Sequence, residues 1–209
     1  MSEALEISSD IKSQVSKEEW KTREDLAAAY RLVANYGWDD MVFTHLSARV
    51  PGPNEHFLLN PFGILFEEVS ASSLVKIDLD GNIVGESEWK ANPAGFIIHS
   101  AVHANKEDAH CVMHTHTNAG MAMAGLKNGL LNIDFSGSAF HKKVAYHDFE
   151  GVTLREDECK RIADDLGDKS AMILKNHGLL TTGPTIAEAF MRLYTLESAC
   201  QVQLLARAC

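Results

Sequence analysis

Residues 111–117 read Cys-Val-Met-His-Thr-His-Thr, a short apolar run that ends in two histidines. This composition predicts a β-strand, and alternate side chains of a strand point to the same face. His114 and His116 should therefore lie side by side, in the arrangement that a divalent metal needs from its first two nitrogen ligands. The same pair could instead hydrogen-bond within a polar cluster, so the spacing leaves both interpretations open.

A third histidine follows another strand-like run nearer the C-terminus. Residues 171–175 are predicted to form a strand, and His177 comes directly after it in the segment Lys-Asn-His-Gly at 175–178. Gly178 would allow a second stretch of backbone to approach closely. His177 is a candidate third ligand, although the 61 positions that separate it from His116 mean that spacing cannot join it to the pair.

The rest of the chain alternates between strand and helix signals. Capping boxes of the form Ser/Thr-x-x-Glu begin at Ser16, Thr153 and Thr185, and Asn92-Pro93 opens a helix to about residue 105. A further short helix is expected at residues 118–125, and further strands at residues 41–50, 56–60, 74–78, 83–84, 130–134 and 144–148. Strands dominate the middle without strict βαβ alternation, which indicates one α/β domain with a mixed sheet covered by helices. We expect this domain over residues 16–209, preceded by a flexible arm at residues 1–15.

The composition narrows the class of partners. The 209 residues carry 19 basic and 29 acidic side chains, a net charge of −10, which disfavours nucleic acids and anionic membranes as partners. There is no apolar run long enough to cross a bilayer and no signal sequence near the N-terminus, and the four cysteines show no paired spacing. These features favour a cytoplasmic protein with reduced thiols. The last helix has no cap before Cys209, which leaves open whether the chain continues.

Several segments, in the same order, resemble the class II aldolase/adducin family from about residue 20 to the end. They are Leu-Asn-Pro-Phe-Gly at 59–63, Asn-Pro-Ala-Gly-Phe-Ile-Ile-His-Ser-Ala at 92–101, His-Thr-His-Thr at 114–117, Val-Ala-Tyr-His-Asp-Phe-Glu-Gly at 144–151 and Lys-Asn-His-Gly-Leu-Leu at 175–180. The resemblance implies a three-layer α/β/α domain around a central mixed, mostly antiparallel sheet. It also implies a divalent metal, zinc first and manganese second, held by His114, His116 and His177. The family further suggests a homo-oligomer, with a tetramer favoured.

The departures from the family are informative. Sugar-phosphate aldolases of the family carry Ser-Ser-Glu at the start of the helix before the His-x-His strand, and Pro93, Ala94 and Gly95 occupy those positions here. The family's catalytic glutamate is thus replaced by Gly95. Phe62 stands for the threonine of a phosphate-binding turn, and His45 stands for an asparagine. Phenylalanine has no side-chain donor for a phosphate, and proline has neither a side-chain donor nor an amide N–H, so we do not expect a phosphorylated sugar as substrate.

Without that glutamate, another group must move the proton. His99, one helical turn after Gly95, and Tyr146 with His147 are the candidate catalytic residues, although each could also be purely structural. Decarboxylation makes fewer demands than aldol cleavage, because carbon dioxide leaves without a prior C–H deprotonation. The resulting hypothesis is a metal-dependent carbon–carbon lyase, of aldolase or decarboxylase type. Its expected substrate is a small non-phosphorylated hydroxy- or keto-acid.

The alternative hypothesis is a protein without catalysis. Asn-Pro-Ala-Gly-Phe at 92–96 resembles the adducin-like branch of the family, whose eukaryotic members associate with spectrin and actin through additional neck and tail segments. The chain could therefore be an adducin-like oligomeric binding module with a cytoskeletal type of association and a structural or vestigial metal site. The number of open coordination positions separates the two, because a structural site is closed by a fourth protein ligand.

Overall fold

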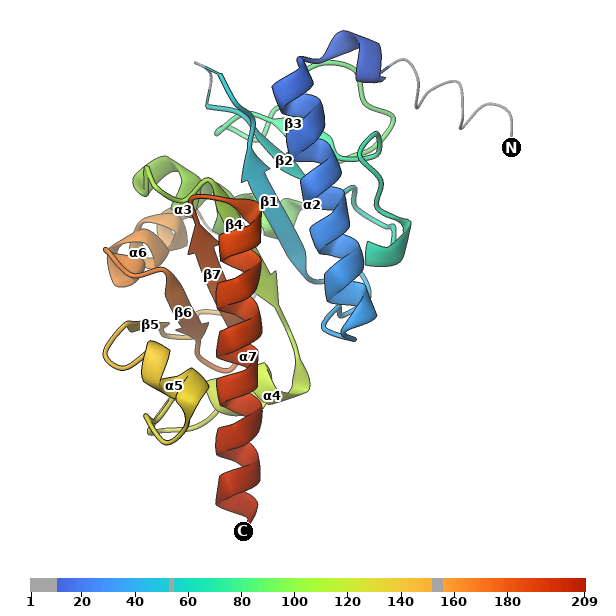
Figure 1. Ribbon diagram of the computed structural model, residues 1–209. Helices are drawn as coiled ribbons and strands as arrows, with labels where there is room; N and C mark the ends of the chain where they lie inside the picture. The colour runs from blue at the N-terminus through green and yellow to red at the C-terminus, as the bar shows by residue number, and fades with distance from the viewer. Residues whose placement is uncertain (1–10, 53–54, 152–155) are drawn as a thin grey trace.

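The computed structural model describes residues 11–52, 55–151 and 156–209, which fold around a seven-stranded sheet (Figure 1). The strands are β1 (His45–Arg49), β2 (Phe57–Leu59), β3 (Val75–Ile77), β4 (Cys111–Thr115), β5 (Val144–His147), β6 (Ala171–Leu174) and β7 (Gly178–Gly183). They are arranged in the order β3-β2-β1-β4-β7-β6-β5, and only the β5–β6 pair is parallel. The expected α/β fold with a mixed, mostly antiparallel sheet is confirmed.

Helices cover both faces of the sheet and make three layers. One face carries α2 (Lys17–Asn35), α4 (Asn118–Ala124), α5 (Phe135–Ala139) and α7 (Ile186–Ala208), and the other carries α3 (Pro93–Asn105) and α6 (Glu156–Leu166). A short 3-10 helix, η1 (Phe66–Glu68), packs against α2. The caps at Ser16 and Thr185 form as expected, each hydroxyl accepting a hydrogen bond from the backbone N–H three residues later.

The alternation of β4 decides which side each of its side chains joins. Cys111 and Met113 belong to the large apolar cluster beneath α2 and α7, whereas Val112 belongs to the cluster beneath α3 and α6. His114 has the same parity as Val112 and therefore points toward the α3 face. The central position of β4 between β1 and β7 buries all five of its residues.

Three local expectations were wrong or incomplete. Residues 130–134 are not a strand, because the backbone N–H of Leu130 donates to the Tyr146 hydroxyl and that of Leu131 to Gln203, and Asp134 caps α5. Residues 83–84 form only an isolated bridge from Ile83 to Ile77. Strand β7 was not expected, since its Gly-Leu-Leu-Thr-Thr-Gly sequence lacks a clear alternating pattern.

Two other expectations fall partly on residues outside the described part of the chain. The capping box at Thr153 is one of these, and α6 is described from Glu156. Of the expected arm at residues 1–15, residues 11–14 form a helical turn ahead of α2. Across the described segments, no helix combines the length and apolar character needed to span a bilayer.

Candidate metal centre

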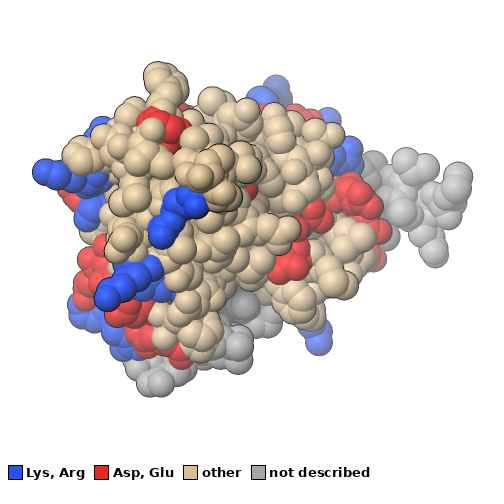
Figure 2. Space-filling view, turned by 90° about the horizontal axis from the view of Figure 1, so that it is seen from below, with Lys and Arg blue, Asp and Glu red and all other residues tan. Residues whose placement is uncertain are grey.

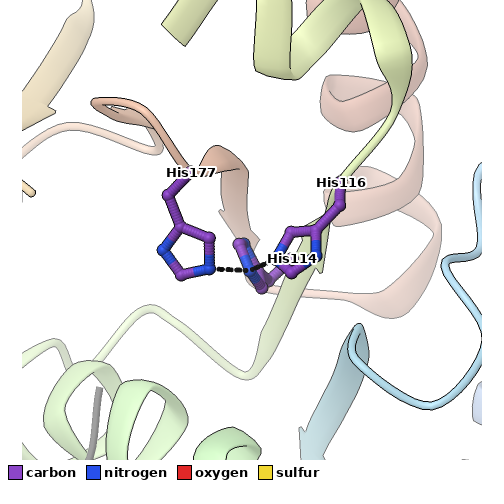
Figure 3. Close-up of side chains that lie close together, drawn as sticks. All are labelled: His114, His116 and His177. Carbon is purple, nitrogen blue, oxygen red and sulfur yellow. Dashed lines mark hydrogen bonds between the residues drawn. The ribbon is translucent and has the colours of Figure 1, made fainter. Parts of the chain in front are cut away.

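Three histidines that are distant in sequence converge through their Nε2 atoms (Figure 3). Nε2 of His114 lies 2.8 Å from Nε2 of His116 and 3.2 Å from Nε2 of His177. Within the described residues these are the three side chains that form a group able to hold a metal ion. The convergence resolves the ambiguity left by spacing, because it joins His177 to the pair.

The pairing of β4 with β7 brings the three residues together. His114 lies on β4, His116 follows the end of that strand, and His177 lies in the turn between β6 and β7. Asn176 adopts a φ of 55° in this turn, a conformation that asparagine tolerates better than most residues. A Cβ on Gly178 would lie 2.3 Å from the Thr115 carbonyl oxygen, so the expected close approach is real.

The hydrogen bonds of the Nδ1 atoms of His114 and His116 fix the tautomers of these two rings. Nδ1 of His114 is 2.9 Å from the Leu179 carbonyl oxygen, and Nδ1 of His116 is 3.1 Å from the Asp40 carboxylate. Both Nδ1 atoms must donate, so in the neutral rings both Nε2 atoms carry lone pairs. Two lone pairs that face each other at 2.8 Å repel, and a cation bound by both nitrogens would remove this repulsion.

The protonation states also suit a metal. Burial lowers the pKa of His114 well below its usual value and lowers the pKa of His177 to about 4, with neighbouring histidines adding to both shifts. Both rings are therefore neutral at pH 7, as metal ligands must be. Zn–N bonds of about 2.0–2.1 Å in tetrahedral geometry place two nitrogens roughly 3.3 Å apart. The 3.2 Å between His114 and His177 is close to this value, whereas the 2.8 Å between His114 and His116 would have to widen. The residues present fit a divalent cation held by three imidazoles.

Asp40 belongs to the site, and the sequence analysis did not identify it. It lies in the segment between α2 and β1, where its carboxylate orients the His116 ring. Carboxylate–histidine pairs of this kind are common behind metal ligands. No spacing rule relates residue 40 to residue 116, so the signal exists only in the folded chain.

His45 occupies the space where the family's glutamate would begin. A Cβ built on Gly95 would lie 2.9 Å from Cγ of His45, closer than real Cβ contacts. His45 is paired with His114 across β1 and β4, and their ring centroids are 5.0 Å apart. The imidazole at position 45 thus fits only because residue 95 has no side chain, so the two positions are sterically linked.

The three candidate catalytic residues lie in different surroundings. His99 is fully buried on α3, with Nε2 2.8 Å from Nδ1 of His45, so it lies behind His45. His147 lines a small cavity that His177 also lines, and its Nδ1 is 2.7 Å from Asp165. Tyr146 points to the opposite face of β5 from His147, where it packs against the large apolar cluster and its hydroxyl accepts from Leu130. The structure brings His147 and, through His45, His99 to the histidine cluster, but not Tyr146.

The buried histidines predict that the metal-free protein loses stability in acid. Burial lowers the pKa of His103 to about 3, so the unfolded chain binds this proton below about pH 6.5 and the folded chain does not. Stability should therefore fall as the pH falls from 6.5 toward 3, by about 2 kcal/mol at pH 5 for this one group. Urea unfolding in EDTA at pH 7.5, 6 and 5 measures the slope.

The variant His103→Asn isolates this contribution. Its unfolding free energy should fall less steeply with decreasing pH than that of the wild type, while His141→Ala, at an exposed position, should keep the wild-type slope. Equal slopes for His103→Asn and the wild type would contradict the prediction.

Comparisons with known proteins agree with this fold. The family profile described as Class II Aldolase and Adducin N-terminal domain matches residues 24–204. A crystal structure of an aldolase II superfamily protein from Pseudomonas syringae has a TM-score of 0.93 and 51% identity, covering 95% of this chain and 80% of that one. L-fuculose 1-phosphate aldolase from Glaciozyma antarctica has a TM-score of 0.83 and 37% identity, covering 91% and 75%. Alpha-adducin of Mus musculus is 45% identical over 86% of this chain and 25% of its own length.

The fold and the cluster of histidines define an α/β protein of the class II aldolase type. This chain belongs to the class II aldolase/adducin family. The resemblance noted in the sequence is confirmed at the level of the family and the fold.

Proposed function

We propose that the protein is a metal-dependent carbon–carbon lyase, of aldolase or decarboxylase type, that acts on a small non-phosphorylated hydroxy- or keto-acid. The observation that carries the proposal is the convergence of three Nε2 atoms, of which those of His114 and His116 both present lone pairs when their rings are neutral. Three protein ligands leave open positions for a substrate, whereas a fourth would close the site. Zinc suits an all-imidazole set best, and manganese is the second choice.

The metal, when bound, would polarise a substrate oxygen and accept electron density as the carbon–carbon bond breaks. The chain must supply one proton afterwards, and His147 is the best-placed of the three candidates. It lines the cavity beside His177, and its Nε2 is buried without a hydrogen-bond partner among the described residues. Asp165 holds the opposite nitrogen and so orients the ring. His99 acts as a positioning residue behind His45, and Tyr146 supports the loop at Leu130.

The lost phosphate-binding features support the substrate class. Pro93 and Ala94 stand where the sugar-phosphate aldolases of the family carry two serines, and Phe62 is half exposed without any polar side-chain atom to offer a phosphate. A small carboxylic acid could instead bind through its own oxygens at the open metal positions.

The experiment is an assay of the metal-loaded protein against a panel of small hydroxy- and keto-acids. Release of an aldehyde would identify an aldolase, and release of carbon dioxide a decarboxylase. His147→Asn should lower kcat at least about 100-fold if this ring moves the proton. His141→Ala is the control on an exposed histidine. Absence of metal from protein expressed in zinc-supplemented medium, with no effect of zinc on thermal stability, would contradict the proposal.

Asp40→Asn tests the carboxylate behind His116. The amide keeps the shape but loses the charge that holds the Nδ1 proton, so we expect zinc affinity to fall about 10–100-fold. Competition with a chromophoric chelator measures the affinity. Asp39→Asn, one residue earlier in the same segment, is the matched control and should bind zinc as the wild type does.

We also propose a homo-oligomer, with a tetramer favoured, in the cytoplasm. Large apolar side chains are exposed next to the segments that carry the site, namely Met41, Phe43, Met121 and Phe149. Figure 2 views the molecule from the end at which α7 finishes and α4 lies, and few charged side chains cover the middle of that face. Light scattering after size-exclusion chromatography measures the mass, and a monomer at micromolar concentration would contradict this part of the proposal.

The second candidate function is a non-catalytic adducin-like binding module. It is favoured by the 45% identity to alpha-adducin together with the missing catalytic glutamate. In this case the metal would be structural or vestigial, and no acid of the panel would be cleaved although the protein retained zinc. Co-sedimentation with actin filaments is the direct test, with the exposed-site variant His141→Ala as a matched control for non-specific loss.

A further inference from the structure

We propose that His45 presents an unprotonated Nε2 to the metal site and accepts a hydrogen bond from a hydroxyl group of the bound ligand. This makes His45 a specificity-determining residue, and it selects hydroxy-acids over keto-acids of the same size. The ligand class rests on the proposed metal site. The tautomer of His45 does not, because it follows from hydrogen bonds within the protein.

The backbone carbonyl of Ala109, 64 residues further along the chain than His45, fixes the tautomer of the first ring in a series of hydrogen bonds. Nδ1 of His103 lies 3.0 Å from the carbonyl oxygen of Ala109. A carbonyl can only accept, so His103 must carry its proton on Nδ1. Burial keeps this ring neutral by lowering its pKa to about 3, which leaves Nε2 as an acceptor. That Nε2 is 2.8 Å from Oγ of Ser47, and Ser47 must therefore donate its only proton to it.

The donor and acceptor roles at Ser47 then fix the tautomers of the next two rings, His99 and His45. Having donated, Ser47 Oγ accepts from the nitrogen on its other side, which is Nδ1 of His99. The neutral His99 ring consequently has a lone pair on Nε2, which lies 2.8 Å from Nδ1 of His45. His45 must donate across this contact, so its proton is on Nδ1 and its Nε2 is bare.

The four hydrogen-bonded side chains are buried, and this burial fixes which atom donates in each hydrogen bond. His45, Ser47, His99 and His103 are at most 1% exposed, and each contact is between groups on β1 and α3. Burial lowers the pKa of His99 well below its usual value, so this ring is neutral like that of His103, and the same enclosure disfavours a charge on His45. Reversing one hydrogen bond would require reversing all of them and would leave His103 facing the Ala109 carbonyl without a proton.

The bare Nε2 of His45 belongs to a ring that lies beside the metal site. It has no hydrogen-bond partner among the described residues, and it is not one of their fully buried partnerless polar atoms, so it reaches solvent-accessible space. The ring centroid is 5.0 Å from that of His114, the residue that pairs with His45 across β1 and β4. A Cβ at position 95 would lie 2.9 Å from Cγ and 3.1 Å from Cδ2 of this ring, so the ring can keep its position because residue 95 is glycine.

A hydrogen-bond acceptor at this position distinguishes ligands that carry a hydroxyl proton from ligands that do not. An α-hydroxyl group can donate to the lone pair, whereas a keto oxygen would face it lone pair to lone pair. A hydrogen bond gained in one case and a repulsion in the other predict about a tenfold or larger preference for the hydroxyl.

Nitrogen-15 NMR of histidine-labelled, metal-free protein at pH 7.5 tests the tautomer directly. We expect His45, His99 and His103 all to carry the proton on Nδ1. Ser47→Ala removes the link between His103 and His99, and the His45 ring should then populate the other tautomer. The control Ser100→Ala removes a hydroxyl next to His99 that bonds only within α3, and it should leave His45 unchanged. A wild-type His45 protonated on Nε2, or a Ser47→Ala protein with unaltered His45 signals, would overturn the proposal.

Calorimetry of the zinc-loaded protein tests the ligand class with glycolate and with methoxyacetate, in which a methyl group replaces the hydroxyl proton. The wild type should bind glycolate about tenfold more tightly, and His45→Phe, which keeps a ring against Gly95, should bind the two alike. Equal affinities in the wild type would overturn the assignment of the ligand class. If the tautomers are as expected but zinc does not bind, the proposed lyase function is contradicted, whereas the tautomer assigned to His45 is supported.

Discussion

Replacing His116 with alanine is expected to lower zinc affinity by more than about a hundredfold, since changes behind a ligand already cost 10–100-fold. His116 supplies one of the three converging nitrogens, and its side chain lies at the edge of the site rather than in an apolar cluster. The metal-free variant should therefore keep the stability of the wild type within about 0.5 kcal/mol. Metal content after dialysis and chelator competition measure the first quantity, and urea unfolding in EDTA measures the second.

The control for this experiment is His141→Ala. His141 is exposed and distant in sequence from the three ligands, so its loss should leave zinc content unchanged. Wild-type zinc retention by His116→Ala would show that the three nitrogens do not form the site. Equal loss of zinc from both variants would point to non-specific binding.

Replacing Gly95 with alanine should destabilise the protein by about 1–3 kcal/mol, although alanine is normally the better helix residue. The added Cβ would lie 2.9 Å from Cγ of His45, and the hydrogen bond to His99 prevents that ring from moving away. Equilibrium unfolding measures the change. Gly125→Ala is the matched control, because a Cβ there meets atoms no nearer than 3.6 Å.

A double-mutant cycle tests whether the loss of stability in Gly95→Ala comes from the contact with His45. In a His45→Ala background the space is empty, so Gly95→Ala should be neutral or stabilising, and the coupling should exceed about 1 kcal/mol. If Gly95→Ala costs the same in both backgrounds, the strain does not come from His45. The result also bears on the missing glutamate, because a larger side chain at position 95 would need a smaller residue at position 45.

The outline of the fold could be predicted from the sequence because most of its signals are local. The cap at Ser16 begins α2, the Asn92-Pro93 pair precedes α3, and the run at 111–115 is strand β4. Residues 130–134 were predicted wrongly because their backbone N–H groups are satisfied by side chains from β5 and α7. An apolar pattern cannot reveal partners that distant.

The candidate site also has a part that local sequence signals predict and a part that depends on contacts distant in sequence. The sequence by itself determined that His114 and His116 share a face of one strand, since the period of a strand is local geometry, and its motifs supplied His177 and the loss of the glutamate. Only the tertiary structure decided that Asp40 stands behind His116 and that His45 fills the space at Gly95. The direction of the hydrogen bonds behind His45 also depends on the Ala109 carbonyl. Pairing of strands and packing of α3 on the sheet bring these groups within contact, and no spacing along the chain encodes such contacts.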